Sequence, residues 1–271
     1  MHDSVIIGGG PAGVSAALTL RARGRSVLLV TGQTADIPLY RSERIANYPG
    51  VPDISGKELL ERMENQALAS GAELIRGHAT AAMALGESFG VAVGTEFYEG
   101  RTLLLCTGVR QGRTFPGEDE YLGRGVSYCV TCDGMLYRGR DAAVIGFTSD
   151  AEDEAETLRS MGCGVTLFTD RTARYEILGG DTVTALSVDG TEHPVSAVFI
   201  LRPGSAPEKL LEGVETENGR IVTGRDMSAS IRGVFAAGDC TGAPCQIAKA
   251  VGEGNIAALS AAKYLDELTK E

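Results

Sequence analysis

Two cysteines separated by two residues stand near the middle of the chain, in the segment Cys129-Val-Thr-Cys132-Asp133-Gly134. A C-x-x-C pair can close a small disulfide ring, and pairing lowers the pKa of one thiol, which then exchanges with a second disulfide through a mixed intermediate. Asp133 follows directly and could act as acid or base toward a leaving thiolate. The alternative is a zinc site, whose second pair of ligands would be Cys240 and Cys245. The segment therefore predicts thiol–disulfide chemistry.

A glycine turn near the start of the chain is the second candidate site. The run Gly8–Gly13 fits G-x-G-x-x-G, in which Gly8 permits a tight turn, Gly10 lets backbone approach a pyrophosphate, and Gly13 packs a helix on a strand. N–H groups at the start of that helix would then take the phosphate charge. The acid that usually holds a ribose after the second strand is missing, so Thr31, Gln33 or a backbone contact would replace it. The turn predicts dinucleotide binding.

The elements that position these residues alternate between strand and helix. Apolar runs at 4–7 and 26–30 flank a small-residue helix from Pro11 to about Arg23, which is a βαβ unit and hence a parallel sheet. A second helix begins at a capped start near Ser55, and strands are expected at 73–75, 90–93 and 101–106. The pattern repeats weakly as a strand at 141–145, a helix at 150–161 and a strand at 165–168, before a strand at 198–201 and a terminal helix at 247–268.

The fold class that follows is α/β with two Rossmann-like domains. A dinucleotide-binding domain is expected in two segments, 1–111 and 198–271, with a smaller, degenerate nucleotide-binding-like domain inserted at 112–197. The net charge of −11 argues against nucleic acid or an anionic membrane as partner. No run approaches a membrane span, and six cysteines without a secretory leader favour the reducing cytoplasm.

Several motifs, in the same order along nearly the whole chain, resemble low-molecular-weight thioredoxin reductases. They are Gly8–Gly13, Arg44–Gly50, Cys106–Gly108, Gly123–Ser127 leading into Cys129–Gly134, Gly233–Asp239, and Gln246–Ile247 followed by Ala258. The resemblance implies a homodimeric FAD enzyme that acts on sulfur groups and reduces a thioredoxin-type disulfide. It also implies an inserted domain that rotates, so that the cysteines meet flavin in one state and protein substrate in the other.

The same resemblance implies roles for single residues. Cys132 would face the flavin, Cys129 would attack the disulfide of thioredoxin, and Asp133 would be the general acid. No metal-binding residue is expected. The expected FAD-binding residues are Gly8, Gly10, Pro11, Ala12, Gly13, Thr31, Gln33, Asn47, Ala79, Thr107, Gly108, Gly238, Asp239, Gln246 and Ile247.

The inserted domain departs from the family at the place where the resemblance implies NADPH. Only Gly146 of its glycine motif remains, and Phe147 and Thr148 put side chains where backbone should approach phosphate. The next strand ends at 169–171 without the paired basic residues that bind a 2′-phosphate. We therefore expect no ordinary NADPH site. Acids also crowd the first turns of the following helix, where an anion would bind: Asp150, Glu152, Asp153, Glu154 and Glu156.

These departures resemble the ferredoxin-dependent flavin thioredoxin reductases, which keep FAD and the C-x-x-C pair and lack the nicotinamide site. The resemblance implies reduced ferredoxin as the electron donor, in two one-electron transfers. Ferredoxins are usually acidic, so the net charge of −11 opposes their approach unless the surface carries a local basic patch. The candidates for such a patch are Arg21, Arg23, Arg25, Arg41, Arg44, Arg110 and Arg113.

Other functions stay open at this point. Asp170 at a strand end could hold an NADH ribose, which would make the chain an NAD(P)H-dependent thioredoxin reductase with a diverged site. A dithiol oxidase passing electrons to oxygen would use the same groups, and a non-enzymatic flavin-binding scaffold would keep the fold alone. Among the remaining cysteines, Cys106 and Cys163 lie in apolar runs that favour packing. For Cys240 and Cys245, where the family usually has Arg at 245, a second redox pair and simple packing are both open.

Overall fold

The computed structural model describes residues 1–51, 53–77, 79–93, 96–109, 114–128, 130–147, 151–201 and 210–269, without the side chains of residues 36, 80, 131 and 132. The chain divides into two compact units, one formed by Met1–Val109 with Ala206–Glu271 and the other by Arg110–Ser205. Cys129, Thr148, Asp150, Arg110 and Arg113 lie outside the described residues.

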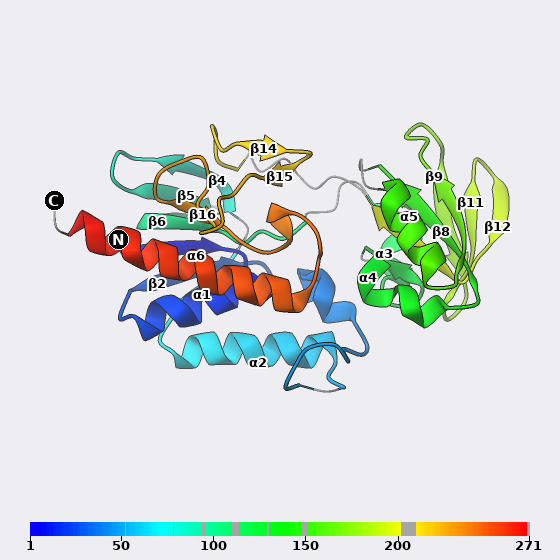
Figure 1. Ribbon diagram of the computed structural model, residues 1–271, viewed down its shortest axis with the longest axis horizontal. Coiled ribbons are helices and arrows are strands. Elements are labelled where there is room, and N and C mark those ends of the chain that lie inside the picture. Colours follow the sequence, from blue (N-terminus) through cyan, green and yellow to red (C-terminus); the bar gives the residue numbers. More distant parts are fainter. Residues whose placement is uncertain are drawn as a thin grey trace. The chain divides into compact units, whose positions relative to one another are not determined.

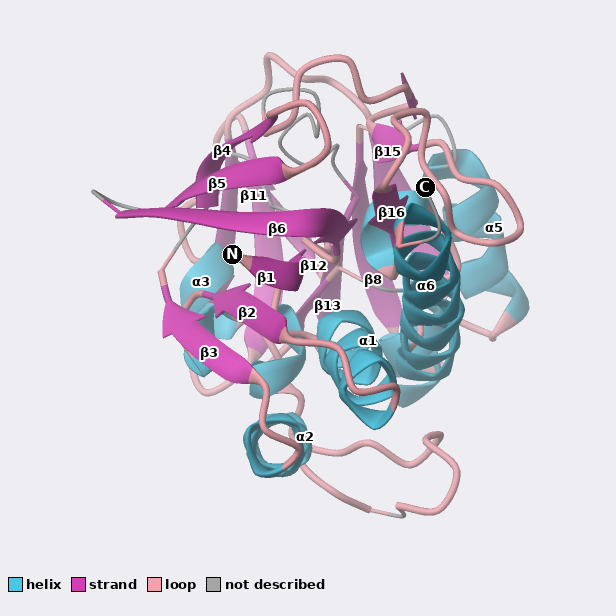
Figure 2. Ribbon diagram, turned by 90° about the vertical axis from the view of Figure 1, so that its left-hand side faces the viewer, coloured by secondary structure: helices cyan, strands magenta, loops and turns pink. Residues whose placement is uncertain are grey.

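The first unit is built on a sheet with the order β3-β2-β1-β6-β5-β4, in which β16 also pairs with β6 (Figure 2). Its parallel strands are β1 (His2–Ile7), β2 (Val27–Thr31), β3 (Glu73–Arg76), β6 (Glu96–Leu105) and β16 (Val234–Ala236). Antiparallel strands β4 (Ala79–Ala84) and β5 (Phe89–Val93) extend one edge. Because the central strands are parallel, β1, β2, β6 and β16 deliver their following loops to one edge of the sheet.

Three helices cover one face of this sheet: α1 (Pro11–Ala22), α2 (Gly56–Ala69) and α6 (Ile247–Leu268) (Figure 1). Helix α2 begins as expected, since the Ser55 hydroxyl accepts the Glu58 N–H and caps the first turn. Helices α1 and α6 run side by side and approach closely, because a Cβ on Gly254 would lie 2.1 Å from the carbonyl oxygen of Ala12. Short elements complete the unit: η1 (Thr34–Asp36), η2 (Pro38–Arg41), β14 (Thr216–Glu217), β15 (Arg220–Ile221) and η5 (Asp239–Thr241).

The second unit holds a parallel sheet with the order β7-β13-β8-β9 and an antiparallel sheet β10-β11-β12. The first comprises β7 (Val126–Ser127), β13 (Ala197–Leu201), β8 (Asp141–Gly146) and β9 (Gly164–Phe168). The second comprises β10 (Tyr175–Gly179), β11 (Val183–Val188) and β12 (Thr191–Pro194). Its helical elements are α3 (Glu118–Tyr121), α4 (Val130–Asp133), η3 (Gly134–Tyr137) and α5 (Ala151–Ser160).

Strand β13 corrects the expected boundary of the inserted domain. We expected that domain to end at residue 197, but Phe199 is paired with Val144 of β8 and with Ser127 of β7. The strand therefore belongs to the second unit, which continues to Ser205.

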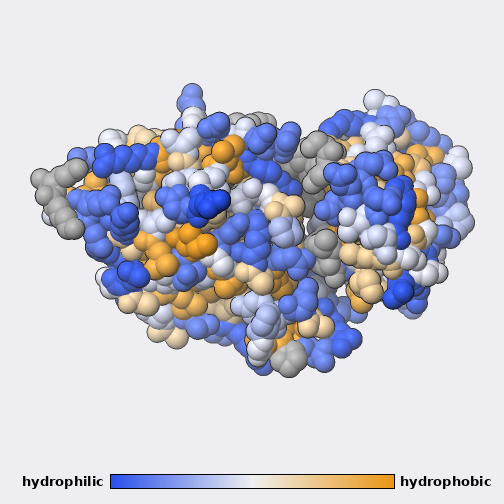
Figure 3. All heavy atoms as spheres, in the orientation of Figure 1, coloured by the Kyte–Doolittle hydropathy of each residue, from blue (hydrophilic) through white to orange (hydrophobic). Residues whose placement is uncertain are grey.

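The surface mixes hydrophilic and hydrophobic side chains, and hydrophobic atoms gather over the part of the first unit where α6 lies (Figure 3). Exposed large apolar side chains on that helix are Ile256 and Leu259. In the described part of the chain, no helix has both the length and the apolar character that a membrane crossing requires.

Candidate functional site

The glycine turn after β1 has the backbone that a pyrophosphate site needs. Gly8 has a φ of +116°, and a Cβ there would lie 2.0 Å from the carbonyl oxygen of Cys106. A Cβ on Gly13 would lie 1.8 Å from the carbonyl oxygen of Gly8, so the helix can approach the turn this closely only because residue 13 is glycine. Gly10 caps α1, nothing lies within 4 Å of its added Cβ, and the first turn holds no acidic residue. The N-terminus of α1, with Pro11 and Ala12, thus fits the FAD pyrophosphate.

The end of β2 and the loop after it carry Thr31 and Gln33, the residues expected at the ribose. Thr31 is buried, and its side chain packs against the turn, since a Cβ on Gly9 would lie 2.4 Å from its Oγ1. Gln33 is exposed two residues later. Sequence reasoning missed Arg76 at the end of β3, which donates to the Gly32 carbonyl at 3.1 Å and forms an ion pair with Glu64. A charged residue closing a strand that neighbours β2 was the signal for it.

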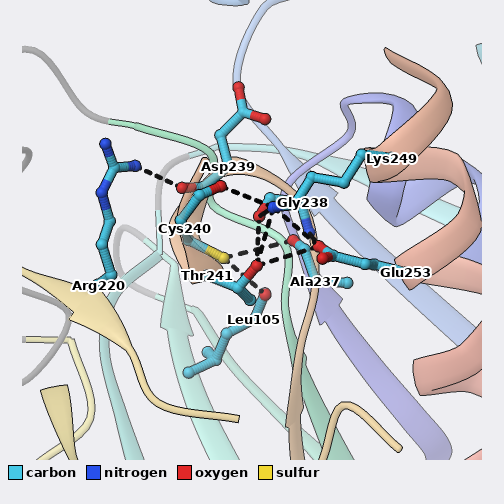
Figure 4. A network of polar contacts seen from close by, with 10 residues as sticks. Leu105, Arg220, Ala237, Gly238, Asp239, Cys240, Thr241, Lys249 and Glu253 are labelled. Carbon is cyan, nitrogen blue, oxygen red and sulfur yellow. Dashed lines mark hydrogen bonds and ion pairs between the residues drawn. The ribbon is translucent and has the colours of Figure 1, made fainter. Parts of the chain in front are cut away.

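The loop at 238–242 lies against the first turn of α1, because a Cβ on Gly238 would be 2.9 Å from the Cβ of Ala12. Two residues of α6 bind this loop (Figure 4). The Lys249 ammonium donates to the carbonyl oxygens of Gly238 at 3.0 Å and Gly242 at 2.7 Å. The Glu253 carboxylate accepts the N–H of Gly238 at 2.9 Å and lies 3.1 Å from the Lys249 ammonium. Neither residue was a sequence-based candidate.

Asp239, expected to contact the ribitol, lies half-buried in this loop. Burial raises the pKa of its carboxyl, while the cations of Lys249 and Arg220 and a hydrogen bond from the Cys245 thiol oppose that rise. Arg220 also donates to the carbonyl oxygen of Asp239 (Figure 4). The carboxyl thus experiences the positive charge of two side chains, Lys249 of α6 and Arg220 of β15.

The N-terminus of α6 brings together residues that are far apart in the sequence. The Asn47 amide donates to the Gln246 Oε1 at 3.2 Å, so two expected flavin contacts lie side by side. Ile247 opens the helix and packs against the apolar cluster of Ile45, Ile54 and Leu59. Near the end of β6, Thr107 hydrogen-bonds Cys240, and Gly108 has a φ of +63°. Ala79 begins β4 and packs against the apolar cluster that contains Val5, Val91 and Leu103.

Among the cysteine side chains that the structure describes, the four thiols are not in disulfides, and three of them are buried. Cys106 and Cys163 pack in apolar clusters, as expected, and burial raises the pKa of both. Cys240 donates to the carbonyl oxygens of Leu105 and Ala237, and burial raises its pKa to about 11. Since a thiolate is the reactive form, Cys240 is a poor exchange partner and packing describes it better than a redox pair with Cys245.

The redox segment of the second unit is described from Val130 onward. Helix α4 contains the backbone of Cys132, and Val130 anchors it in the core. Asp133 is half-buried, and the Ser127 hydroxyl donates to its Oδ2 at 2.8 Å. Burial raises the pKa of the Asp133 carboxyl, and the hydrogen bond from Ser127 lowers it in part. A carboxyl that keeps its proton closer to neutral pH suits a general acid.

The crevice beyond the carboxyl ends of β8 and β9 is where a Rossmann-like unit binds nucleotide. Phe147 follows β8, and its ring lies 6.1 Å from that of Tyr175 and 6.4 Å from that of Phe115. The Arg171 guanidinium lies 5.1 Å from the centre of the Phe147 ring and donates to the Phe147 carbonyl. The remaining glycine serves packing, since a Cβ on Gly146 would be 2.4 Å from the Cβ of Ala151.

The arginines expected to form a basic patch are largely engaged within the chain. Arg21 donates to the carbonyl oxygens of Ser70 and Arg25. Arg25 pairs with Asp266, and Arg44 pairs with Asp53 at 2.8 Å. These contacts hold the three side chains within the chain, and the two ion pairs offset the charge of Arg25 and Arg44. They therefore weaken the expectation of a basic patch built on Arg21, Arg25 and Arg44.

The chain matches a family model described as pyridine nucleotide-disulphide oxidoreductase over residues 2–179 and 173–254. Curated relatives include a thioredoxin reductase of Listeria innocua, 32% identical over 99% of this chain and 95% of the relative, and one of Aquifex aeolicus, 34% identical over 88% and 85%. A solved ferredoxin-flavin thioredoxin reductase from Clostridium acetobutylicum is 34% identical, covers 100% of this chain and 99% of its own, and gives a TM-score of 0.64. A thioredoxin reductase from Streptococcus pyogenes is 29% identical over 98% and 99%, with a TM-score of 0.83.

Proposed function

Given that this chain belongs to the low-molecular-weight thioredoxin reductases of the pyridine nucleotide-disulphide oxidoreductase family, we propose that reduced ferredoxin, instead of NADPH, supplies its electrons. The chain is a thioredoxin reductase-type FAD oxidoreductase acting on sulfur groups, and the expected α/β fold is confirmed. The proposed substrate is a thioredoxin-type disulfide, reduced through Cys129 and Cys132.

The nucleotide crevice of the second unit carries the proposal on the donor. In the first unit, α1 starts without acidic side chains and Gly10 leaves its N-terminus open. In the second unit, the first turn of α5 contains Glu152, Asp153 and Glu154, and the side chains of Phe147 and Arg171 pack at the end of β8. Acids at a helix N-terminus repel a pyrophosphate, and side chains after the strand keep it from the backbone. At the residues that the structure describes, the first turn thus offers an open helix N-terminus, whereas the second is flanked by packed side chains and by acids.

The solved relatives include a ferredoxin-flavin enzyme, which is consistent with ferredoxin as the donor. The ferredoxin-flavin thioredoxin reductase of Clostridium acetobutylicum matches the whole chain at 34% identity. Relatives named simply thioredoxin reductase match at similar identity, so the crevice and not the overall similarity decides between donors.

The proposed chemistry is a dithiol–disulfide exchange. FAD, when bound, supplies a carrier that accepts electrons singly and passes them on as a pair. The Cys129 thiolate attacks one sulfur of the substrate disulfide, which forms a mixed disulfide and releases the other sulfur as a thiolate. Asp133 donates a proton to that leaving thiolate. The Cys132 thiolate then attacks the Cys129 sulfur, which closes the Cys129–Cys132 disulfide and frees the reduced substrate.

The proposal includes a homodimer, which the family resemblance implies, and a location in the cytoplasm, which the cysteine usage favours. Light scattering on the purified holoprotein would give a mass near twice that of one chain if the dimer forms.

Titration of the FAD-loaded protein with nucleotide tests the closed crevice. We expect NADPH and NADH to give no saturable heat in calorimetry up to about 1 mM, because acids in the first turn of α5 repel the nucleotide phosphates. The double substitution Glu152→Gln with Asp153→Asn removes two negative charges from the first turn of α5. It serves as the comparison that measures how strongly these charges repel the nucleotide phosphates. Saturable NADPH binding in the micromolar range by the unchanged protein would overturn the proposal.

A further inference from the structure

Lys249 and Glu253 lie one turn apart on α6, with side chains only 16% and 17% exposed. A buried ammonium is stable only when its donors find acceptors. Lys249 has four polar neighbours within 3.1 Å: the carbonyl oxygens of Gly238 and Gly242, the Thr241 hydroxyl and the Glu253 carboxylate. These contacts use the three N–H donors of the ammonium fully.

The two side chains grip the same peptide from both sides. Lys249 binds the carbonyl oxygen of Gly238, and Glu253 accepts its N–H at 2.9 Å. Both also contact the Thr241 hydroxyl, at 3.1 Å and 3.0 Å (Figure 4). Gly238 has a φ of +89°, and glycine takes up positive and negative φ values about equally readily, so its own backbone preference does not fix this conformation. The orientation of this residue is therefore fixed by α6 and not by the loop alone.

The position of Gly238 matters because of what lies on either side of it. The residue packs on Ala12 at the start of α1, and Asp239, the expected ribitol contact, follows it directly. A change in the Gly238 peptide would move Asp239 relative to the glycine turn. The clamp thus links the two halves of the cofactor site.

We propose that Lys249 and Glu253 form a clamp that sets the shape of the 238–242 loop for FAD, with Lys249 as a positioning residue that also places a positive charge beside Asp239. The inference rests on FAD binding at this loop and is independent of the electron donor. A second ion pair at the same spacing on α6, Lys263–Glu267, is 80% and 54% exposed with a 4.0 Å separation. Exposed pairs of this kind contribute little, so Lys263 provides the matched control.

The test compares FAD affinity in reconstituted apoprotein for Lys249→Met, Glu253→Gln and Lys263→Met, read from quenching of flavin fluorescence. We expect Lys249→Met to weaken binding by about tenfold to a hundredfold, which corresponds to loss of hydrogen bonds to a charged group. Glu253→Gln keeps an acceptor for the Gly238 N–H and should weaken binding less. Lys263→Met should bind FAD as tightly as the unchanged protein.

Two further measurements separate positioning from general stability. Lys249→Met should lower the flavin reduction potential, because a nearby positive charge favours the reduced, more negative flavin, whereas Lys263→Met should leave it unchanged. Should Lys249→Met fail to fold, Thr241→Val removes the hydroxyl that accepts from Lys249 and donates to Glu253, without stranding a charge, and it should weaken FAD binding several-fold. Unchanged FAD affinity in Thr241→Val and in any folded Lys249→Met, or an equal loss in Lys263→Met, would overturn the inference.

Discussion

Asp133 shows how one contact can tune a residue that its sequence position makes reactive. The Ser127 hydroxyl fixes the carboxyl at 2.8 Å, while burial raises its pKa. Burial favours the protonated carboxylic acid, and the hydrogen bond keeps its orientation. Both effects suit the role that we propose for Asp133, which is to give a proton to a leaving thiolate.

Asp133→Asn separates the catalytic role of this carboxyl from its effect on stability. Disulfide reduction should fall by about 10²- to 10⁴-fold, the usual contribution of a general acid. At neutral pH the free energy of unfolding should rise in this variant, although its activity falls. Because the pKa is raised in the folded state, the carboxyl stabilises the fold below its ordinary pKa, and this contribution is lost as the pH rises through the raised value.

Denaturant unfolding at pH 7 and near pH 4 measures this second effect. The asparagine variant should be more stable than the unchanged protein at pH 7, and the difference should shrink on acidification. Equal activity of the two proteins, or a less stable variant at pH 7, would contradict this assignment of Asp133.

At the scale of elements, helix α6 connects the cofactor loop, the glycine turn and the sheet. Its start orders Gln246 against Asn47, its second turn holds the 238–242 loop, and Gly254 lets it approach α1. The glycine at 254 is therefore a packing requirement.

Gly254→Ala tests this close approach, with Gly252→Ala as the control on the same helix. The added Cβ at 254 would lie 2.1 Å from the Ala12 carbonyl oxygen and should destabilise the protein by about 1–3 kcal/mol, as overpacking does. At 252 nothing lies within 4 Å, so alanine should stabilise the helix by about 1 kcal/mol. Thermal unfolding of both variants reports the sign, and equal effects would refute the packing role.

The elements that sequence could predict have strong local signals. The terminal helix at 247–268 and the capped start of α2 were found because periodicity and capping are properties of neighbouring residues. The antiparallel strands β10–β12 were missed, since all three are short and β12 is polar apart from Pro194. Motif glycines of the site were likewise predictable, whereas Arg76, Ser127 and the 249–253 clamp act through contacts between distant segments. Such contacts leave no local pattern.

At the scale of the whole molecule, two similar turns have opposite properties. The helix after β1 has no acidic side chain in its first turn, whereas Phe147 follows β8 and acids stand in the first turn of α5. On our proposal, the first unit holds the dinucleotide site, and in the second unit the remaining glycine, Gly146, serves helix packing.

Ligand-induced stabilisation should show this asymmetry without any turnover. A ligand at a hundred times its dissociation constant stabilises the folded state by about 2.7 kcal/mol. Excess FAD should raise the melting temperature of apoprotein, whereas 1 mM NADPH should shift that of holoprotein by less than about 1 °C. A rise of several degrees with NADPH would contradict a closed crevice.

The most direct test of the electron donor is flavin absorbance of the holoprotein without oxygen, after separate addition of NADPH, NADH or reduced ferredoxin. We expect only reduced ferredoxin to bleach the flavin band, and oxidised thioredoxin to restore it. Rapid bleaching by NADPH would contradict the central claim and would show that the turn after β8 still serves a nicotinamide cofactor.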